Sequence, residues 1–145
     1  MNDSVDIAHL IQVALTPIFL MTAVGVTLNV LTNRLARIVD RARLLEQSLS
    51  RPDSAIVAAN AHRKLEVLAR RSGYINAAIT LIIASGLLIS LVVVMLFLNA
   101  FLHWNLAASI AIVFVLSMLS LAASLLAFLI EVRIATAALR IGVSR

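Results

Sequence analysis

The sequence predicts an all-α integral membrane protein with three transmembrane helices and a cytoplasmic helical hairpin that continues the first two spans. Two composition values point to this class: 62% of the 145 residues are hydrophobic and 13% are charged, against about 45–50% and about 25% in soluble domains. The third observation is the spacing of charge. Residues 7–33 and 72–130 hold no Asp, Glu, Lys or Arg, and each run exceeds the roughly 20 residues that cross hydrocarbon as a helix.

The first span is expected at about residues 7–31. Residues 1–6 contain no Lys or Arg, so they lack the basic region of a cleavable signal peptide, and we expect the span to be retained. His9, Gln12 and Thr16 recur at helical spacing opposite an apolar face. That pattern suits either a turn lying in the membrane interface or the wet end of a tilted span.

The second uncharged run is too long for one crossing and must fold back. As a single helix, residues 72–130 would extend roughly 88 Å, against a hydrocarbon core about 30 Å thick. Residues 99–105 are the expected reversal, because this segment holds two Asn, a His and Trp104, the only tryptophan, and Trp favours the membrane interface. Spans two and three are therefore predicted at about residues 74–98 and 106–130.

Every basic residue lies on one side of these spans. Nine of the twelve fall within residues 34–71 and three within the tail, residues 131–145, while the opposite side holds none. Because Lys and Arg are retained in the cytoplasm during insertion, we expect the N-terminus outside and the C-terminus in the cytoplasm. In a bacterium this membrane is the inner membrane. The formal net charge of +5 then reflects topology rather than nucleic-acid binding.

Residues 34–72 are predicted to form the cytoplasmic hairpin. The apolar residues of its first arm step by three and four, as in a coiled-coil seam; they are Leu35, Ile38, Ala42, Leu45 and Leu49. Residues 50–54 supply the turn, because Pro52 ends the first arm and Asp53 or Ser54 is able to cap the second. The seam of the second arm consists of Val57, Ala61, Leu65 and Leu68. The two seams are expected to face each other.

An isolated hairpin of this size is marginally stable. Each arm has about 17 residues, so the hairpin projects roughly 25 Å and leaves part of its apolar surface in water. We therefore expect copies to pack around a symmetry axis as a homo-oligomer. In the alternative arrangement, the hairpin packs only on itself and on the tail.

One face of the first span carries a polar stripe. Its members are Thr22, Gly25, Asn29 and Asn33. An Asn in a span costs free energy unless it finds a partner, so the stripe should face protein or water rather than lipid. The same residues suit two structures: the lining of a water-filled path, or the contact between helices that bond through Asn and approach closely at Gly.

Small and polar residues in the other spans indicate helix packing. In span three they are Ser117, Ser120, Ser124 and Ala127, followed by Glu131, and in span two they are Asn76, Thr80, Gly86 and Ser90. We expect Glu131 to pair with Arg133 at the membrane interface. A gate or proton-responsive pair is the alternative for these two charges.

The sequence shows no pattern typical of an enzyme, a metal site or a cofactor site. His9, His62 and His103 are far apart in the chain, Cys is absent and only four residues are Gly, so we expect no catalytic residues, no metal and no cofactor. Acidic residues interrupt the basic segment, which argues against nucleic acid as a partner. The expected partners are the lipid bilayer and anionic headgroups, contacted by Arg34, Arg37, Arg41, Arg70 and Arg71.

The segment Leu28–Arg43, preceded by Pro17–Leu20, joins an Asn-bearing membrane exit to an Arg-rich helix. In this segment, and more weakly over most of the chain, the sequence resembles a bacterial integral-membrane family catalogued as domain of unknown function 2721. The resemblance implies an uncharacterised multi-pass protein and carries no catalytic residues. Two functions stay open: an oligomeric scaffold or regulatory subunit acting through its hairpin, or a small homo-oligomeric channel lined by the polar stripe.

Overall fold

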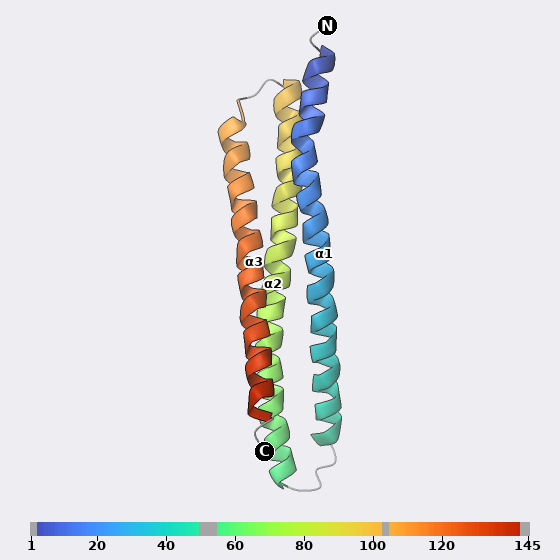
Figure 1. Ribbon diagram of the computed structural model, residues 1–145, viewed down its shortest axis with the longest axis vertical. Coiled ribbons are helices and arrows are strands. Elements are labelled where there is room, and N and C mark those ends of the chain that lie inside the picture. The colour runs from blue at the N-terminus through green and yellow to red at the C-terminus, as the bar shows by residue number, and fades with distance from the viewer. Residues whose placement is uncertain (1–2, 50–54, 103–104, 143–145) are drawn as a thin grey trace. The chain divides into compact units, whose positions relative to one another are not determined.

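The computed structural model describes residues 3–49, 55–102 and 105–142, and the side chains of residues 8, 9, 11–47, 61–101 and 105–136. The described residues form the helices α1 (Asp3–Leu49), α2 (Ala55–Leu102) and α3 (Ala107–Gly142), drawn in Figure 1. The all-α class is therefore confirmed. The predicted turn at residues 50–54 lies outside the described residues.

All three helices are long and apolar enough to cross a membrane. Their candidate spanning segments are Ile11–Gln47, Ala61–Phe101 and Ala107–Thr136. Many large apolar side chains are exposed, including Phe19 at 71% and Leu87 at 68%. Lipid tails are as apolar as leucine, so these side chains need no protein cover inside a bilayer. The helices thus fit a multi-pass membrane protein.

Helices α1 and α2 do not stop where their apolar runs end. α1 passes through Pro17 and continues beyond Arg34 to Leu49 without a break. α2 begins at Ala55 and reaches the second apolar run through Arg71. Both helices therefore continue from the uncharged runs into the basic segment of residues 34–71.

The chain divides into two compact units, each containing part of every helix. Unit 1 comprises residues 1–28 and 80–123, and unit 2 comprises residues 29–79 and 124–145.

In unit 1, α2 and α3 run antiparallel and are joined by serine hydroxyls. Ser85 Oγ donates a hydrogen bond to the carbonyl oxygen of Ser117 at 2.9 Å. One turn further along, Ser120 Oγ donates to the carbonyl oxygen of Leu81 at 2.7 Å. Residue numbers fall on α2 as they rise on α3, so the predicted reversal of the chain is confirmed. Serine side chains are small, so they allow the two backbones to approach closely, and their hydroxyls find hydrogen-bond acceptors on the facing helix.

The reversal itself is partly fixed by an asparagine. Asn99 Oδ1 accepts a hydrogen bond from the backbone N–H of Leu106 at 3.1 Å. Leu106 in turn accepts from the N–H of Ile110 at 2.9 Å, which closes the first turn of α3. This bond links the end of α2 to the start of α3. The predicted interfacial Trp104 lies outside the described residues.

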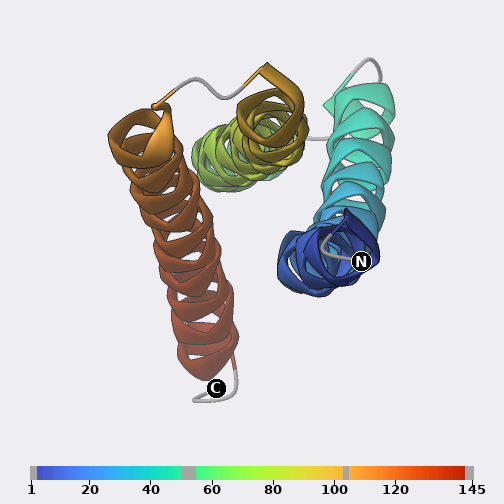
Figure 2. The ribbon, with the colours of Figure 1, turned by 90° about the horizontal axis from the view of Figure 1, so that it is seen from above.

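Unit 1 also brings α1 close to α2 at a glycine. Seen from above, α2 lies between α1 and α3 in this unit (Figure 2). Gly86 is buried, and a Cβ added there would lie 3.3 Å from Val24 Cγ1. Ser90 Oγ donates to the Gly86 carbonyl at 3.0 Å and lies 3.9 Å from Met21 Sδ. Gly86 and Ser90 therefore serve packing.

Unit 2 packs the same helices around a small core. Leu31 and Ile75 are fully buried, and Ile38 and Ala61 are 4% and 5% exposed. Ser124 Oγ donates to the carbonyl oxygen of Ala78 at 2.8 Å, repeating the serine-to-carbonyl contact of unit 1. Residues 33, 72 and 130, at which the two uncharged runs meet charged residues, therefore lie in one unit.

Candidate functional site

The site in unit 2 is built around Glu131, the first charged residue after the long uncharged run. Its side chain is completely buried. Arg71 of α2 donates to Glu131 Oε1 from Nη2 at 2.7 Å and from Nε at 3.1 Å. Arg34 of α1 donates to Oε2 from Nη1 at 3.0 Å. Each helix thus contributes the charged residue at which its uncharged run ends.

The two arginines are held differently. The side chain of Arg71 is 17% exposed, and that of Arg34 is 41% exposed. The Arg34 guanidinium also lies over the ring of Phe128, 5.0 Å from its centroid, within the range of a cation–π contact. Phe128 and Glu131 are separated by one turn of α3, so α3 holds Arg34 through both an aromatic face and a carboxylate.

A buried carboxylate is stable only when charge and hydrogen bonding are both supplied. Each oxygen of Glu131 accepts from a guanidinium, and among the described residues no buried side-chain polar atom lacks a partner. Removing Glu131 would leave two guanidiniums without a counter-charge, and removing either arginine would leave one carboxylate oxygen without its hydrogen-bond donor. The three residues join α1, α2 and α3 at one level of unit 2.

The expected pairing of Glu131 with Arg133 is wrong. Arg133 is exposed, and the salt bridges of Glu131 go to Arg34 and Arg71. The physical reason is helix geometry: residues two apart on a helix lie on different faces. The sequence did indicate that Glu131 has a special role. It is the only acidic residue after Glu66, and it lies at the end of the second uncharged run.

Four arginines line a cavity beside this carboxylate. The cavity has a volume of about 180 Å³ and is lined by Arg34, Arg37, Ile38, Arg41 and Arg71. Of the residues predicted to contact headgroups, Arg34 and Arg71 are thus engaged with Glu131. Arg37 and Arg41 are exposed side chains on the cavity wall, and Arg70 is exposed without lining it.

The predicted polar stripe on α1 lies at the surface of the chain. Thr22, Gly25, Asn29 and Asn33 are all exposed. Asn33 Nδ2 donates to Asn29 Oδ1 at 3.1 Å, one helical turn away. A Cβ added at Gly25 would meet no atom within 4 Å. The stripe is therefore available to water, to lipid or to another chain.

The predicted seams fall on the least exposed faces of the two arms. Ile38 and Ala61 are buried, and the half-buried members are Leu35, Ala42, Leu45, Leu65 and Leu68. The side chains of Leu49 and Val57 lie outside the described residues. Both arms belong to unit 2. Outside the seams, Leu44 is 66% exposed, Val67 39% and Val39 37%.

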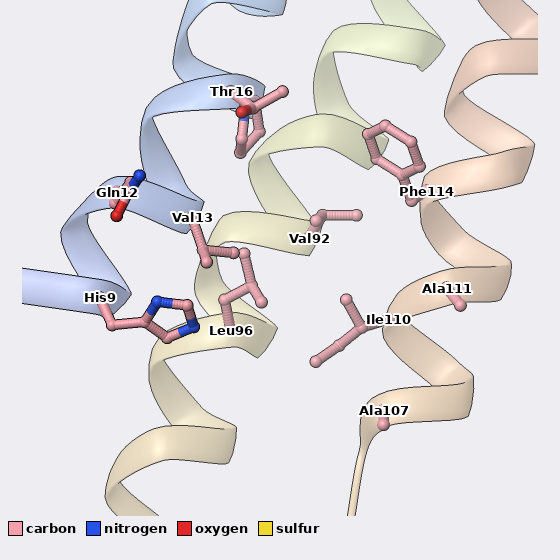
Figure 3. A pocket seen from close by; sticks show the side chains of 11 residues that line it. His9, Gln12, Val13, Thr16, Val92, Leu96, Ala107, Ile110, Ala111 and Phe114 are labelled. Carbon is pink, nitrogen blue, oxygen red and sulfur yellow. The ribbon is translucent and has the colours of Figure 1, made fainter. Parts of the chain in front are cut away.

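Unit 1 contains a larger and mostly apolar cavity of about 560 Å³. Figure 3 shows side chains from all three helices converging on it, among them Leu96 of α2 and Ile110 of α3. His9, Gln12 and Thr16 of α1 also line it. These three polar residues recur every three or four positions in the sequence, which places them on one face of α1, and that face lines the cavity.

Comparison with known protein families gives a match over most of the chain. The family is described as "Protein of unknown function (DUF2721)", and its sequence model matches residues 14–141. This range includes Arg34, Arg71 and Glu131. The resemblance based on the Leu28–Arg43 segment is therefore confirmed. No curated protein and no solved structure matches the chain.

Replacing Glu131 with glutamine keeps the shape of the side chain and removes its charge. Arg34 and Arg71 then face each other without a counter-charge, so we expect the free energy of unfolding to fall by about 3–5 kcal/mol. Titration of the purified protein with SDS in mixed micelles, followed by circular dichroism, measures this loss. Glu66→Gln is the matched control, since it removes one charge from an exposed position on α2. Equal losses in the two variants would contradict the assigned role of Glu131.

Proposed function

The chain belongs to the DUF2721 family of proteins of unknown function, and we propose that it acts as a homo-oligomeric membrane scaffold or regulatory subunit. Its working part is the helical hairpin of residues 34–72, placed in the cytoplasm. The bilayer and its anionic headgroups are its lipid partners, and a second copy of the chain is its first protein partner.

The exposed apolar residues of the hairpin carry this proposal. Leu44, Val67 and Val39 lie outside the seams and are exposed on a single chain. Inside lipid, such residues would not need to be buried against protein. The hairpin, however, carries most of the basic residues and is therefore expected in water. Apolar side chains in water are stabilised by association. A symmetric assembly covers them with the same surface of a neighbouring copy.

The distribution of charge supports the proposed orientation. All twelve Lys and Arg residues lie at residue 34 or beyond, and none falls between Arg71 and Arg133. With three crossings, the basic hairpin and the basic tail then share one side of the membrane. Retention of basic residues in the cytoplasm gives an N-terminus outside and a C-terminus inside. In a bacterium the host membrane is the inner one.

A small homo-oligomeric channel is the second candidate. The observation that favours it is the exposed stripe of Thr22, Asn29 and Asn33 on α1. The amides of Asn29 and Asn33 bond to each other, and an amide has further donor and acceptor capacity. If copies were arranged with α1 toward the symmetry axis, these amides would line a narrow water-filled path along that axis.

Cysteine labelling tests the orientation. Because the chain contains no cysteine, a single introduced thiol reports its own position. In Glu66→Cys, a membrane-impermeant maleimide added to intact cells should leave the thiol unlabelled until the membrane is permeabilised. In Asn105→Cys, placed between α2 and α3, the thiol should react from outside. Labelling of Glu66→Cys in intact cells would reverse the orientation.

Assembly is tested at Leu44, the most exposed large apolar residue among the described side chains of the hairpin. Leu44→Glu places a charge on the proposed contact, so we expect oligomers of the purified protein to dissociate toward monomers at equal concentration. Multi-angle light scattering in detergent gives the mass of each species. Gln47→Glu adds the same charge at a neighbouring exposed polar position and should leave the mass unchanged. A monomeric parent protein would rule out the homo-oligomer.

Planar bilayers test the channel. The purified protein should conduct, and Asn29→Leu should change that conductance while Val26→Leu, an exposed position outside the stripe, should not. Silence across voltage, pH and membrane tension would exclude the channel. Asn33→Leu separates the two proposals for the stripe: a weaker assembly indicates amide bonds between copies, and an unchanged assembly indicates a wet surface.

A further inference from the structure

We infer that the arginine-lined cavity of unit 2 is a binding site for a single phosphate group, held chiefly by Arg37 and Arg41. The inference deepens the proposed contact with anionic headgroups, because it replaces a diffuse attraction at the membrane surface with one cavity and named residues. It is independent of the proposed assembly and of the channel.

The first support is an excess of positive charge. Four arginines line the cavity, and the carboxylate that contacts two of them is that of Glu131. Within the described residues, neither Arg37 nor Arg41 forms an ion pair, and the neighbouring carboxylate of Asp40 is exposed and does not line the cavity. Like charges gathered in a small space repel one another. A bound anion removes that repulsion.

The second support is the shape of the cavity. Arg37 and Arg41 are separated by one turn of α1 and therefore project from the same face. Buried Ile38 lines the cavity between them. The volume of about 180 Å³ is several times the roughly 30 Å³ that a water molecule occupies in the liquid. There is room for a phosphate group with bound water.

The third support is the state of the other two arginines. Glu131 engages Nη1 of Arg34 and both Nε and Nη2 of Arg71. A guanidinium carries five N–H donors, so each arginine keeps donors for a second acceptor. Glu131 is thus a positioning residue, since it fixes the planes of two guanidiniums whose forked donors suit phosphate oxygens.

Two sources can supply the same phosphate chemistry. The cavity lies next to the ends of the uncharged runs, where lipid headgroups are found, and its four arginines would equally accept inorganic phosphate from the cytoplasm. The probes must therefore include both. A single cavity whose arginines hydrogen-bond one phosphate group predicts one ligand per chain. Attraction by a charged surface sets no such number.

The test uses the full chain and two probes. Inorganic phosphate is titrated into protein in a neutral detergent, with thermal stability as the readout. In parallel, protein in phosphatidylcholine nanodiscs containing added phosphatidylglycerol is analysed by native mass spectrometry for retained lipid. We expect saturable stabilisation by inorganic phosphate, or one retained phosphatidylglycerol per chain in excess of the phosphatidylcholine background, because phosphatidylcholine also carries a phosphate. The double variant Arg37→Gln/Arg41→Gln should weaken that binding at least about tenfold.

The control removes the same charge elsewhere. Arg43→Gln/Arg63→Gln changes two exposed arginines that do not line the cavity, and it should bind like the parent protein. Thermal stability of Arg37→Gln/Arg41→Gln without ligand that equals or exceeds that of the parent shows that the fold is intact, since the variant loses two mutually repelling charges. Binding of phosphatidylglycerol alone assigns the site to headgroups, and binding of inorganic phosphate assigns it to free anions as well. Failure of both probes, or equal weakening in the control, would overturn the site without touching the proposed assembly.

Discussion

Unit 2 depends on one constraint: a carboxylate without solvent needs a counter-charge and a hydrogen-bond donor on each of its oxygens. Glu131 meets it with Arg71 on one oxygen and Arg34 on the other. These three charges come from three helices, so the register of each helix against the others is fixed where the uncharged runs end. Apolar packing alone allows one helix to shift along another, because a leucine of the next turn takes the place of the first at little cost in free energy. A bidentate arginine does not allow this, since a shift of one turn breaks both hydrogen bonds.

The interior of unit 1 follows a different rule, because lipid removes the usual gain from burying apolar groups. Close packing then depends on small side chains. Ser85 and Ser120 satisfy their hydroxyls on carbonyls of the facing helix, and Gly86 admits Val24. Each contact is modest, typically about 0.6 kcal/mol for a hydrogen bond between membrane helices. The two serine contacts lie about one turn apart along α2 and α3, so both hold the same pair of helices together.

Much of the fold could be predicted from the sequence, since charge-free runs and helical spacing are local properties. The three helices, the reversal near residues 99–105 and the packing role of the serines on span three all follow from such patterns. Partner choice is not local. Arg34 and Glu131 are 97 residues apart, and nothing in the spacing says which arginine a carboxylate meets. Nearness in the sequence favoured Arg133 as the partner of Glu131, but the arrangement of the helices pairs it with Arg34 and Arg71. Ser85 was missed for the same reason, because its acceptor is a backbone carbonyl of another helix.

The unbroken course of α1 has a mechanical consequence. In a continuous helix each turn is hydrogen-bonded to the next, so unwinding one turn of α1 between its uncharged run and the basic segment would leave backbone groups without partners in apolar surroundings. Membranes of different thickness change the tilt of their helices. A change in bilayer thickness is therefore expected to tilt α1 rather than to unwind it at that point.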